Sequence, residues 1–242
     1  MGKIAHKILY TLLPLGGYLR VVSGVLFLLQ RIGWGRKSAA LEYIYHLPNL
    51  IARGGVAIDI GANLGYYTRT LSSIVGESGE VHGVEPVPPI FEVLKHNTCH
   101  CRNVTLHNVA LGESEATISM ANDSISSGGY FGTGQNFVKQ SAEESVDIEF
   151  EAQMVRGSEL FAKLPRVDLI KCDIEGYEVV VINEIRPLIE RHHPVVLIET
   201  GGENRAQMIS FFTELGYQGF TLQDGKEVPL SEESLKDIIF RP

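Results

Sequence analysis

Apolar and polar residues along the chain follow two alternating patterns from residue 56 onward. Short apolar runs rich in β-branched residues are typical of buried strands, and apolar residues three or four positions apart are typical of helices. These patterns predict seven strands, at residues 56–60, 80–84, 104–108, 167–172, 195–199, 217–222 and 238–240. They predict helices between them, at residues 66–75, 89–100, 158–163, 179–191 and 205–215. Strands that alternate with helices favour a Rossmann-like α/β fold, with a mostly parallel sheet and helices on both of its faces.

The first 40 residues follow another pattern, and we treat them as an apolar helical segment (1–40) ahead of one α/β domain (41–242). Residues 8–19 and 21–29 are apolar, and Arg20 lies between them. A helix that spans a bilayer needs ~20 uninterrupted apolar residues, and an arginine near its centre costs on the order of 2.5–3.5 kcal/mol. The sequence therefore favours either a helix in a membrane interface or a helix packed on the domain, without deciding between them.

The charge of the chain is unevenly distributed. The chain has 242 residues and a net charge of −8, but no acid accompanies the six Lys and Arg residues that precede Glu42. The other 15 basic and 29 acidic residues give the rest of the chain a charge of −14. An acidic body disfavours nucleic acid as a partner, because binding to a phosphate backbone depends on basic patches. A basic first segment is compatible with peripheral contact to an anionic membrane.

The cysteines indicate the compartment. Cys99, Cys101 and Cys172 are too few for a disulfide framework, and Cys172 falls in a predicted buried strand. Free cysteines of this kind are typical of a reducing compartment. We therefore expect a cytoplasmic protein, and peripheral attachment to a membrane stays open.

The turn after the first predicted strand is the most informative local motif. Asp59 comes near the end of that strand, and Gly61 and Gly65 allow a tight turn that exposes the backbone before a helix. Glu85 follows the second strand, twenty residues after Gly65, where a carboxylate can accept both hydroxyl protons of a ribose. A nucleoside pocket is therefore expected. The alternative is an ordinary strand-to-helix turn, in which Asp59 and Asn63 act as helix caps.

The details of this turn favour one nucleoside cofactor over another. A dinucleotide site needs a third glycine and a helix start open to a pyrophosphate, whereas this chain places Tyr66 and Tyr67 there. A cofactor with an adenosine, an amino-acid tail and no phosphate fits better, and S-adenosylmethionine (SAM) is such a compound. Asp59 and the turn would meet its methionine portion, Glu85 its ribose, and Asn108 or the backbone of Val109 and Ala110 its adenine.

Further polar residues follow the later strands. In open α/β sheets reactive groups gather at the carboxyl ends of the strands, so Asp173 and Glu199 should share one cleft with the cofactor. Asp173 is the leading candidate for a general base, and Lys171 precedes it on the same face of its strand. A second interpretation is that Asp173 and Glu199 hold a divalent cation, and the use of a metal stays open.

An insertion separates the third and fourth predicted strands. Residues 117–120 and 148–155 are expected to pair as an antiparallel ribbon. Between them, residues 126–134 are rich in glycine and serine and include two aromatic residues. We interpret this stretch as a flap over the acceptor, with an ordinary surface linker as the alternative.

Several blocks of the sequence resemble the FkbM family of SAM-dependent methyltransferases. They lie at residues 56–68, 84–86, 108–112, 168–178 and 196–199, in the order found in the family. The most specific is the Lys-x-Asp-x-Glu-Gly block that begins at Lys171. The resemblance covers about residues 50 to 242 and implies a class I methyltransferase fold with a seven-stranded sheet. It also implies O-methylation, usually of sugars or secondary metabolites.

The residues and the resemblance together predict one site. The predicted catalytic residues are Asp173, Lys171 and Glu199. The predicted cofactor-binding residues are Asp59, Gly61, Asn63, Gly65, Tyr66, Glu85, Pro86, Asn108, Val109, Ala110 and Asp173.

The predicted function is transfer of a methyl group from SAM to a hydroxyl of a sugar, a glycan, a lipid or a secondary metabolite. The acceptor is expected to be a small molecule, a glycan or a lipid-linked compound, and not a nucleic acid. Two alternatives are an NAD-type oxidoreductase and a non-catalytic scaffold associated with membranes. The incomplete dinucleotide motif weakens the first, and the presence of Asp59, Glu85 and Asp173 together weakens the second.

Overall fold

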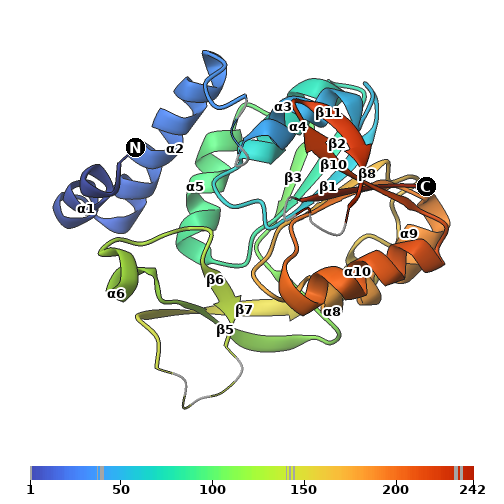
Figure 1. The fold of residues 1–242 in the computed structure, drawn as a ribbon. Coiled ribbons are helices and arrows are strands. Elements are labelled where there is room, and N and C mark those ends of the chain that lie inside the picture. Colours follow the sequence, from blue (N-terminus) through green and yellow to red (C-terminus); the bar gives the residue numbers. More distant parts are fainter. Residues whose placement is uncertain are drawn as a thin grey trace.

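The computed structural model describes residues 2–36, 38, 41–139, 141, 143, 145–231, 234 and 237–242. Within these residues the main sheet has eight strands in the order β11-β10-β12-β9-β8-β1-β2-β3 (Figure 1). The strands are β1 (Val56–Ile60), β2 (Glu80–Val84), β3 (Val104–His107), β8 (Leu169–Cys172), β9 (Val195–Ile198), β10 (Gln218–Gln223), β11 (Lys226–Pro229) and β12 (Ile238–Arg241).

All seven predicted strands belong to this sheet. β3, β2, β1, β8 and β9 are parallel, while β12 and β10 add antiparallel strands beyond β9. The eighth strand, β11, pairs antiparallel with β10 at the edge of the sheet. Its sequence, Lys-Glu-Val-Pro, carries two charges and a proline, which is typical of an edge strand and gives little signal for one.

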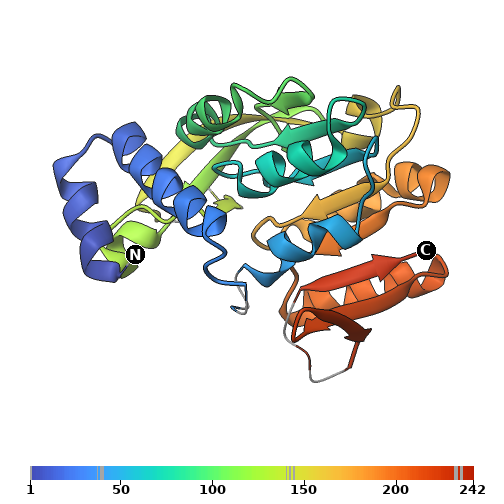
Figure 2. The same ribbon diagram turned by 90° about the horizontal axis from the view of Figure 1, so that it is seen from above.

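Helices cover both faces of the sheet, as the α/β pattern predicts (Figures 1 and 2). They are α3 (Glu42–His46), the short 3₁₀ helix η1 (Leu47–Asn49), α4 (Tyr66–Val75), α5 (Pro88–Thr98), α7 (Gly157–Leu160), α8 (Glu178–Glu184), α9 (Arg186–His192) and α10 (Gly202–Glu214). The single helix predicted at 179–191 is two helices. Pro187 lies in the first turn of α9, and because it has no N–H to donate, the helix restarts there.

The two sides of each central strand belong to different cores. Ala57, Leu169 and Leu197 pack with residues of α3, η1 and α4 in one core. Ile58 and Val196, one residue along their strands, pack with α8, α9 and α10 in the other. Since side chains alternate between the faces of a strand, the side chains of Asp59 and Lys171 must lie on the α4 side.

A smaller sheet lies beside the main one (Figure 1). It has four strands in the order β4-β7-β5-β6, with bounds β4 (Ala110–Leu111), β5 (Ala116–Asn122), β6 (Asn136–Val138) and β7 (Ile148–Val155). The antiparallel pairing of β5 with β7 confirms the predicted ribbon. The helix α6 (Ser124–Gly128) follows β5, and the chain returns to the smaller sheet as β6.

The first segment forms two helices, α1 (Lys3–Leu12) and α2 (Leu15–Arg31). Figures 1 and 2 show α2 beside α5 and α1 at the outer edge of the molecule. Tyr18, Leu19 and Val22 of α2 are buried in a third core, which also includes residues of α5 and of the smaller sheet. This observation supports packing on the domain for one side of α2. No helix in the described part of the chain is long and apolar enough to cross a membrane.

Candidate active site

The turn after β1 brings two strands unusually close. The backbone N–H groups of Gly61 and Ala62 donate to the carbonyl of Val84, at 3.0 and 2.9 Å. Gly61 has a φ of +76°, and a Cβ on it would lie 2.0 Å from the carbonyl oxygen of Asp173. Only glycine fits there, because both the left-handed backbone and the close approach of Asp173 exclude a side chain. The ends of β1, β2 and β8 therefore meet around one point.

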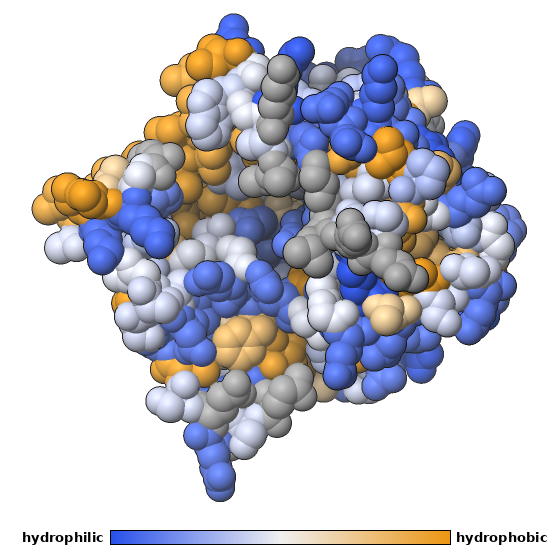
Figure 3. Space-filling view, viewed as in Figure 1, coloured by the Kyte–Doolittle hydropathy of each residue, from blue (hydrophilic) through white to orange (hydrophobic). Residues whose placement is uncertain are grey.

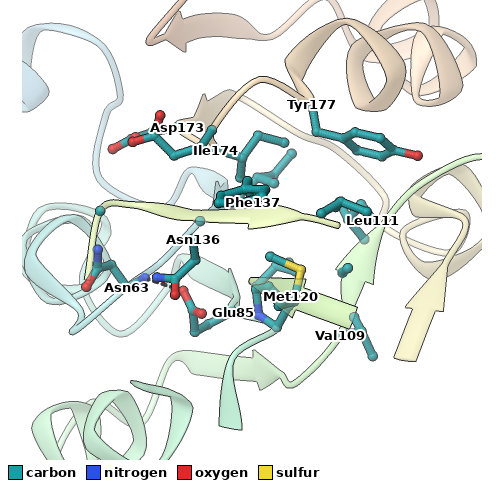
Figure 4. Close-up of a pocket in the computed structure, with 18 of the residues that line it drawn as sticks. Asn63, Glu85, Val109, Leu111, Met120, Asn136, Phe137, Asp173, Ile174 and Tyr177 are labelled. Carbon is teal, nitrogen blue, oxygen red and sulfur yellow. Dashed lines mark hydrogen bonds between the residues drawn. The ribbon is translucent and has the colours of Figure 1, made fainter. Parts of the chain in front are cut away.

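Glu85 closes one end of a pocket at this point. Its side chain is buried and lies beside Asn63 (Figure 4). Its two oxygens accept hydrogen bonds from the backbone N–H groups of Asn63 (2.9 Å) and Val87 (3.0 Å). Burial raises the pKa of Glu85 to about 7, although both hydrogen bonds act in the opposite direction. The carboxylate is thus fixed by backbone groups of the turn after β1 and of the segment after β2, and it keeps acceptor positions free on both oxygens.

The pocket runs from Glu85 to Asp173 and has mostly apolar walls. One wall comes from the chain after β3, with Val109 and Leu111. The other comes from the smaller sheet, where Phe137 of β6 crosses the pocket between Glu85 and Asp173 (Figure 4). Its lining also includes Ile60, Gly61, Asn63, Val84, Pro86, Ala110, Met120, Thr133, Gly134, Asn136, Val138, Ile174, Glu175 and Tyr177.

Seven of the predicted cofactor-binding residues line this pocket. They are Gly61, Asn63, Glu85, Pro86, Val109, Ala110 and Asp173. A carboxylate at one end, an apolar middle and a second carboxylate at the other end match a ribose, an adenine and a cationic sulfonium group. The residues present therefore fit SAM.

The other four predicted cofactor-binding residues lie outside the pocket lining. Gly65 is the N-cap of α4, and a Cβ there would lie 2.9 Å from Leu94, so it allows α4 and α5 to pack closely. The Tyr66 ring packs against Phe27 of α2, with 5.3 Å between ring centroids. Asn108 donates from its amide to the carbonyls of Glu85 and Pro86, at 2.8 and 3.1 Å, and so supports the pocket wall. Their roles in cofactor binding stay predictions.

Asp59, the fourth, is completely buried on the α4 side of the sheet. Thr68 of α4 donates to its Oδ2 at 2.6 Å, and Nζ of Lys171 lies 3.6 Å from its Oδ1. Burial raises the pKa of Asp59, and the Lys171 ammonium opposes that rise. Asp59 therefore contacts Lys171 and does not line the pocket, and its role in cofactor binding stays a prediction.

Lys171 contacts both the buried carboxylate of Asp59 and the partly buried carboxylate of Asp173. Its Nζ lies 2.9 Å from the carboxylate of Asp173 and donates to the carbonyl of Gly61 at 3.1 Å. Burial lowers the pKa of Lys171, but the charges of Asp173 and Asp59 outweigh it and hold the pKa above its ordinary value. Lys171 is thus a permanent cation, and it lies over the ring of Tyr67 at 4.8 Å.

Asp173 and Glu199 form a carboxyl pair at the far end of the pocket. Burial would raise the pKa of Asp173, but Lys171 and a hydrogen bond with Glu199 keep it below its ordinary value. The same hydrogen bond, followed by burial and the charge of Asp173, raises the pKa of Glu199 to about 8. At neutral pH the pair therefore holds one proton, on Glu199, and Asp173 is ionised.

A second pocket opens on the other side of Asp173. Its lining is acidic and polar, with Asp173, Glu175, Glu178, Glu199, Thr200, Asn204 and Asp237. Asp173 lines both pockets, so a group bound in the second would lie beside a cofactor bound in the first. Within the described ranges, no cluster of three or more His, Cys, Asp or Glu side chains could hold a metal ion.

Sequence analysis did not single out several residues that line the first pocket. Asn136 and Phe137 belong to β6, which pairs with β5. The sequence pattern did not indicate this pairing. Thr133 and Gly134 belong to the stretch interpreted as a flap, and both line the pocket. Phe131, in the same stretch, is buried in the core shared with α2. The stretch is therefore anchored to the domain at this residue.

Comparison with known proteins identifies the family of this chain. The model of the family described as "Methyltransferase FkbM domain" matches residues 59–218. A curated protein-L-isoaspartate O-methyltransferase from Caenorhabditis elegans is 24% identical over 152 residues, which are 57% of this chain and 66% of that protein. The chain therefore spans slightly less than two thirds of this relative.

Solved structures show the same fold. A methyltransferase FkbM from Methylobacillus flagellatus KT superposes with a TM-score of 0.53 and 15% identity, over 79% of this chain and 44% of that one. A protein described as an rRNA methylase from Clostridium thermocellum superposes with a TM-score of 0.51 and 11% identity, over 84% of this chain and 93% of that one. The predicted class I methyltransferase fold is confirmed.

Proposed function

Because this chain belongs to the FkbM family of SAM-dependent methyltransferase domains, we propose that it methylates a hydroxyl oxygen of a small-molecule, glycan or lipid-linked acceptor. The observation that carries the proposal is the position of Asp173. This carboxylate lies between a pocket suited to SAM and a second, polar pocket, at the end of β8. A base is needed where the acceptor and the methyl group meet. Asp173 and Glu175 both line the two pockets, and we assign the base to Asp173 because Lys171 holds its carboxylate in place.

The first pocket would hold the cofactor through a few contacts. Glu85 would accept the two hydroxyl protons of the ribose, and the apolar side chains of Val109, Met120 and Phe137 would enclose the adenine. The cofactor supplies an activated methyl group when bound. The ionised carboxylate of Asp173 would lie near its positive charge, so the pocket provides a favourable interaction at both ends.

Asp173 would accept the proton that the acceptor hydroxyl loses. Lys171 holds this carboxylate through an ion pair of 2.9 Å, and Glu199 donates a hydrogen bond to it. Methyl transfer to oxygen is an in-line displacement, so a carboxylate held by two contacts helps to align the acceptor. Lys171 is buried behind Asp173 and acts here as a positioning residue.

The second pocket supports a neutral or cationic acceptor over an anionic one. Five carboxyl groups line it, and those of Glu199 and Asp237 have pKa values raised to about 8 and about 6. Carboxyl groups bind hydroxyl groups well because they accept hydrogen bonds, and they repel phosphate and carboxylate groups. A polyhydroxylated group such as a sugar fits this chemistry.

The acceptor class can be tested with labelled SAM. The purified protein is incubated with methyl-labelled SAM and with cell extract separated into aqueous and organic-soluble fractions. We expect the label to appear in a compound from which mild base does not release it, as for a methyl ether. Label that base releases as methanol would indicate a methyl ester and would contradict the hydroxyl acceptor.

The affinity for SAM should depend on the protonation of Glu85. Burial raises its pKa to about 7 in the free protein, and only the ionised form can accept both ribose hydroxyls. Below that pH, binding requires loss of a proton, so Kd should rise by up to about tenfold for each pH unit. Calorimetric titration across the neutral range measures this slope. A Glu85→Gln variant should bind more weakly with a flat pH dependence, and an equal slope in both proteins would contradict the role of Glu85.

The rate of methyl transfer should depend on Glu199. The pKa of about 8 means that Glu199 gives up the shared proton above this pH, which makes Asp173 a stronger base. In the wild-type enzyme kcat should therefore rise as the pH passes through about 8. Glu199→Gln keeps a hydrogen-bond donor beside Asp173 but cannot ionise, so its kcat should stay at the level of the lower-pH plateau. Pre-steady-state kinetics at several pH values distinguish the two profiles, and parallel profiles would exclude Glu199 as the titrating group.

A further inference from the structure

The α1 and α2 helices expose an unusual number of large apolar side chains. On α1 these are Ile4, Ile8 and Leu12, four residues apart, and two of them, Ile4 and Leu12, are more than 70% exposed. On α2 and just after it they are Val21, Leu28, Ile32 and Trp34. We call these seven residues the outer stripe. Figure 3 shows the corresponding hydrophobic colour over α1 at the left and over the end of α2 at the top.

The opposite sides of both helices are already occupied. His6 of α1 stacks on Tyr130 with 4.8 Å between ring centroids, and its Nδ1 lies 2.9 Å from the hydroxyl of Tyr18. Tyr18 of α2 donates to the carbonyl of Phe131 at 3.1 Å. Leu9 and Leu13 also pack into the core shared with the smaller sheet. The helices are thus held on the domain by their inner sides, and this leaves the outer stripe facing solvent.

The charged residues that α1 and α2 carry beside the outer stripe are all basic. Lys3 and Lys7 are exposed next to Ile4 and Ile8 on α1, while Arg20 and Arg31 are exposed on α2. No Asp or Glu precedes Glu42, although the rest of the chain is strongly acidic. An apolar surface with a rim of one sign of charge matches a partner that is apolar inside and negatively charged at its surface. Trp34, at the end of the stripe, is a residue type enriched at membrane interfaces.

We propose that the outer stripe docks on the surface of an anionic lipid bilayer. The apolar side chains enter the boundary between headgroups and acyl chains, and the Lys and Arg side chains lie at the level of the lipid phosphates. The helices lie in the plane of the membrane and do not cross it. The acidic body of the protein faces away from the negative surface, so the uneven charge of the chain orients it.

Vesicle sedimentation of the full chain tests this proposal. The probes are vesicles of phosphatidylcholine alone and of phosphatidylcholine mixed with phosphatidylglycerol. The wild-type protein should sediment with the anionic vesicles and much less with the neutral ones. Ile8→Glu combined with Leu28→Glu should reduce the bound fraction at least tenfold. Lys3→Gln combined with Lys7→Gln should weaken binding to anionic vesicles by roughly fivefold for each charge removed and should leave the weak binding to neutral vesicles unchanged.

Leu160→Glu is the matched control, because Leu160 is an exposed apolar residue on α7, outside the hairpin of α1 and α2. It should bind vesicles like the wild type, and all variants should unfold at the same temperature. Unchanged sedimentation of the Ile8→Glu and Leu28→Glu variant would overturn the proposal. It would also be overturned if the wild type ignored both kinds of vesicle and formed a concentration-dependent dimer that this variant dissociates, since the stripe would then bind a second copy of the chain.

Discussion

Replacement of Asp173 by Asn is expected to lower kcat by about 10²–10⁴-fold, the usual contribution of a general base. The change keeps the shape of the side chain but removes the carboxylate that would take the acceptor's proton, and it leaves one acceptor oxygen in place of two. Asp173 lines both pockets, so the chemical step should lose far more than cofactor affinity does. Single-turnover methyl transfer, measured together with calorimetric titration of SAM, separates the two effects.

Asp224→Asn is the matched control for this substitution. Asp224 is exposed in the turn between β10 and β11, with a φ of +51°, a conformation that Asn also tolerates well. It should leave kcat and SAM affinity unchanged. If Asp173→Asn retained most of the wild-type kcat, Asp173 would not be the base, and its role would be limited to binding.

Replacement of Lys171 by Met is expected to destabilise the fold by about 3–5 kcal/mol, the range for removing one partner of a buried ion pair. Lys171 and Asp59 are both buried, and the ammonium lies 3.6 Å from the Asp59 carboxylate. Without the lysine, the Asp59 carboxylate keeps only the hydrogen bond from Thr68 among the contacts described above. Urea unfolding at neutral pH measures the loss.

The double variant Asp59→Asn, Lys171→Met distinguishes a broken pair from lost packing. It removes the uncompensated charge, so it should recover much of the stability that Lys171→Met loses. The loss of stability caused by Lys171→Met alone should also become smaller as the pH falls. Burial raises the folded-state pKa of Asp59, so the cost of its charge grows with rising pH and is absent below its unfolded pKa. A double variant as unstable as the single one would contradict the pairing.

Much of the main sheet could be predicted from the sequence because its strands are short apolar runs between turn signals. The position of Glu85 could also be predicted, since the residue after a parallel strand lies at the edge where ligands bind. Asp59 shows the limit of that rule. It is the fourth residue of β1 and faces the same side as Ala57, so alternation along the strand directs it to α4 and Thr68. The alternation of side chains along the strand therefore predicts that the Asp59 side chain lies on the α4 side of the sheet.

The wall formed by Asn136 and Phe137 could not be predicted in the same way. It depends on the strand with which β6 pairs and on the register of that pairing. The residues of β6 alone determine neither. The role of Tyr66 was equally hidden, because its partner Phe27 lies on α2, in a segment whose packing the sequence left open. Both cases involve contacts between segments that neither local pattern nor spacing connects.

A crystal structure of the protein with S-adenosylhomocysteine, the product of methyl transfer, tests the central claim most directly. We expect both ribose hydroxyls within about 3 Å of the Glu85 carboxylate. We expect the adenine between Val109 and Phe137, and the sulfur directed toward Asp173. Adenosine bound at any other place on the protein, or no binding of this compound at concentrations that saturate related enzymes, would contradict the assignment of this pocket.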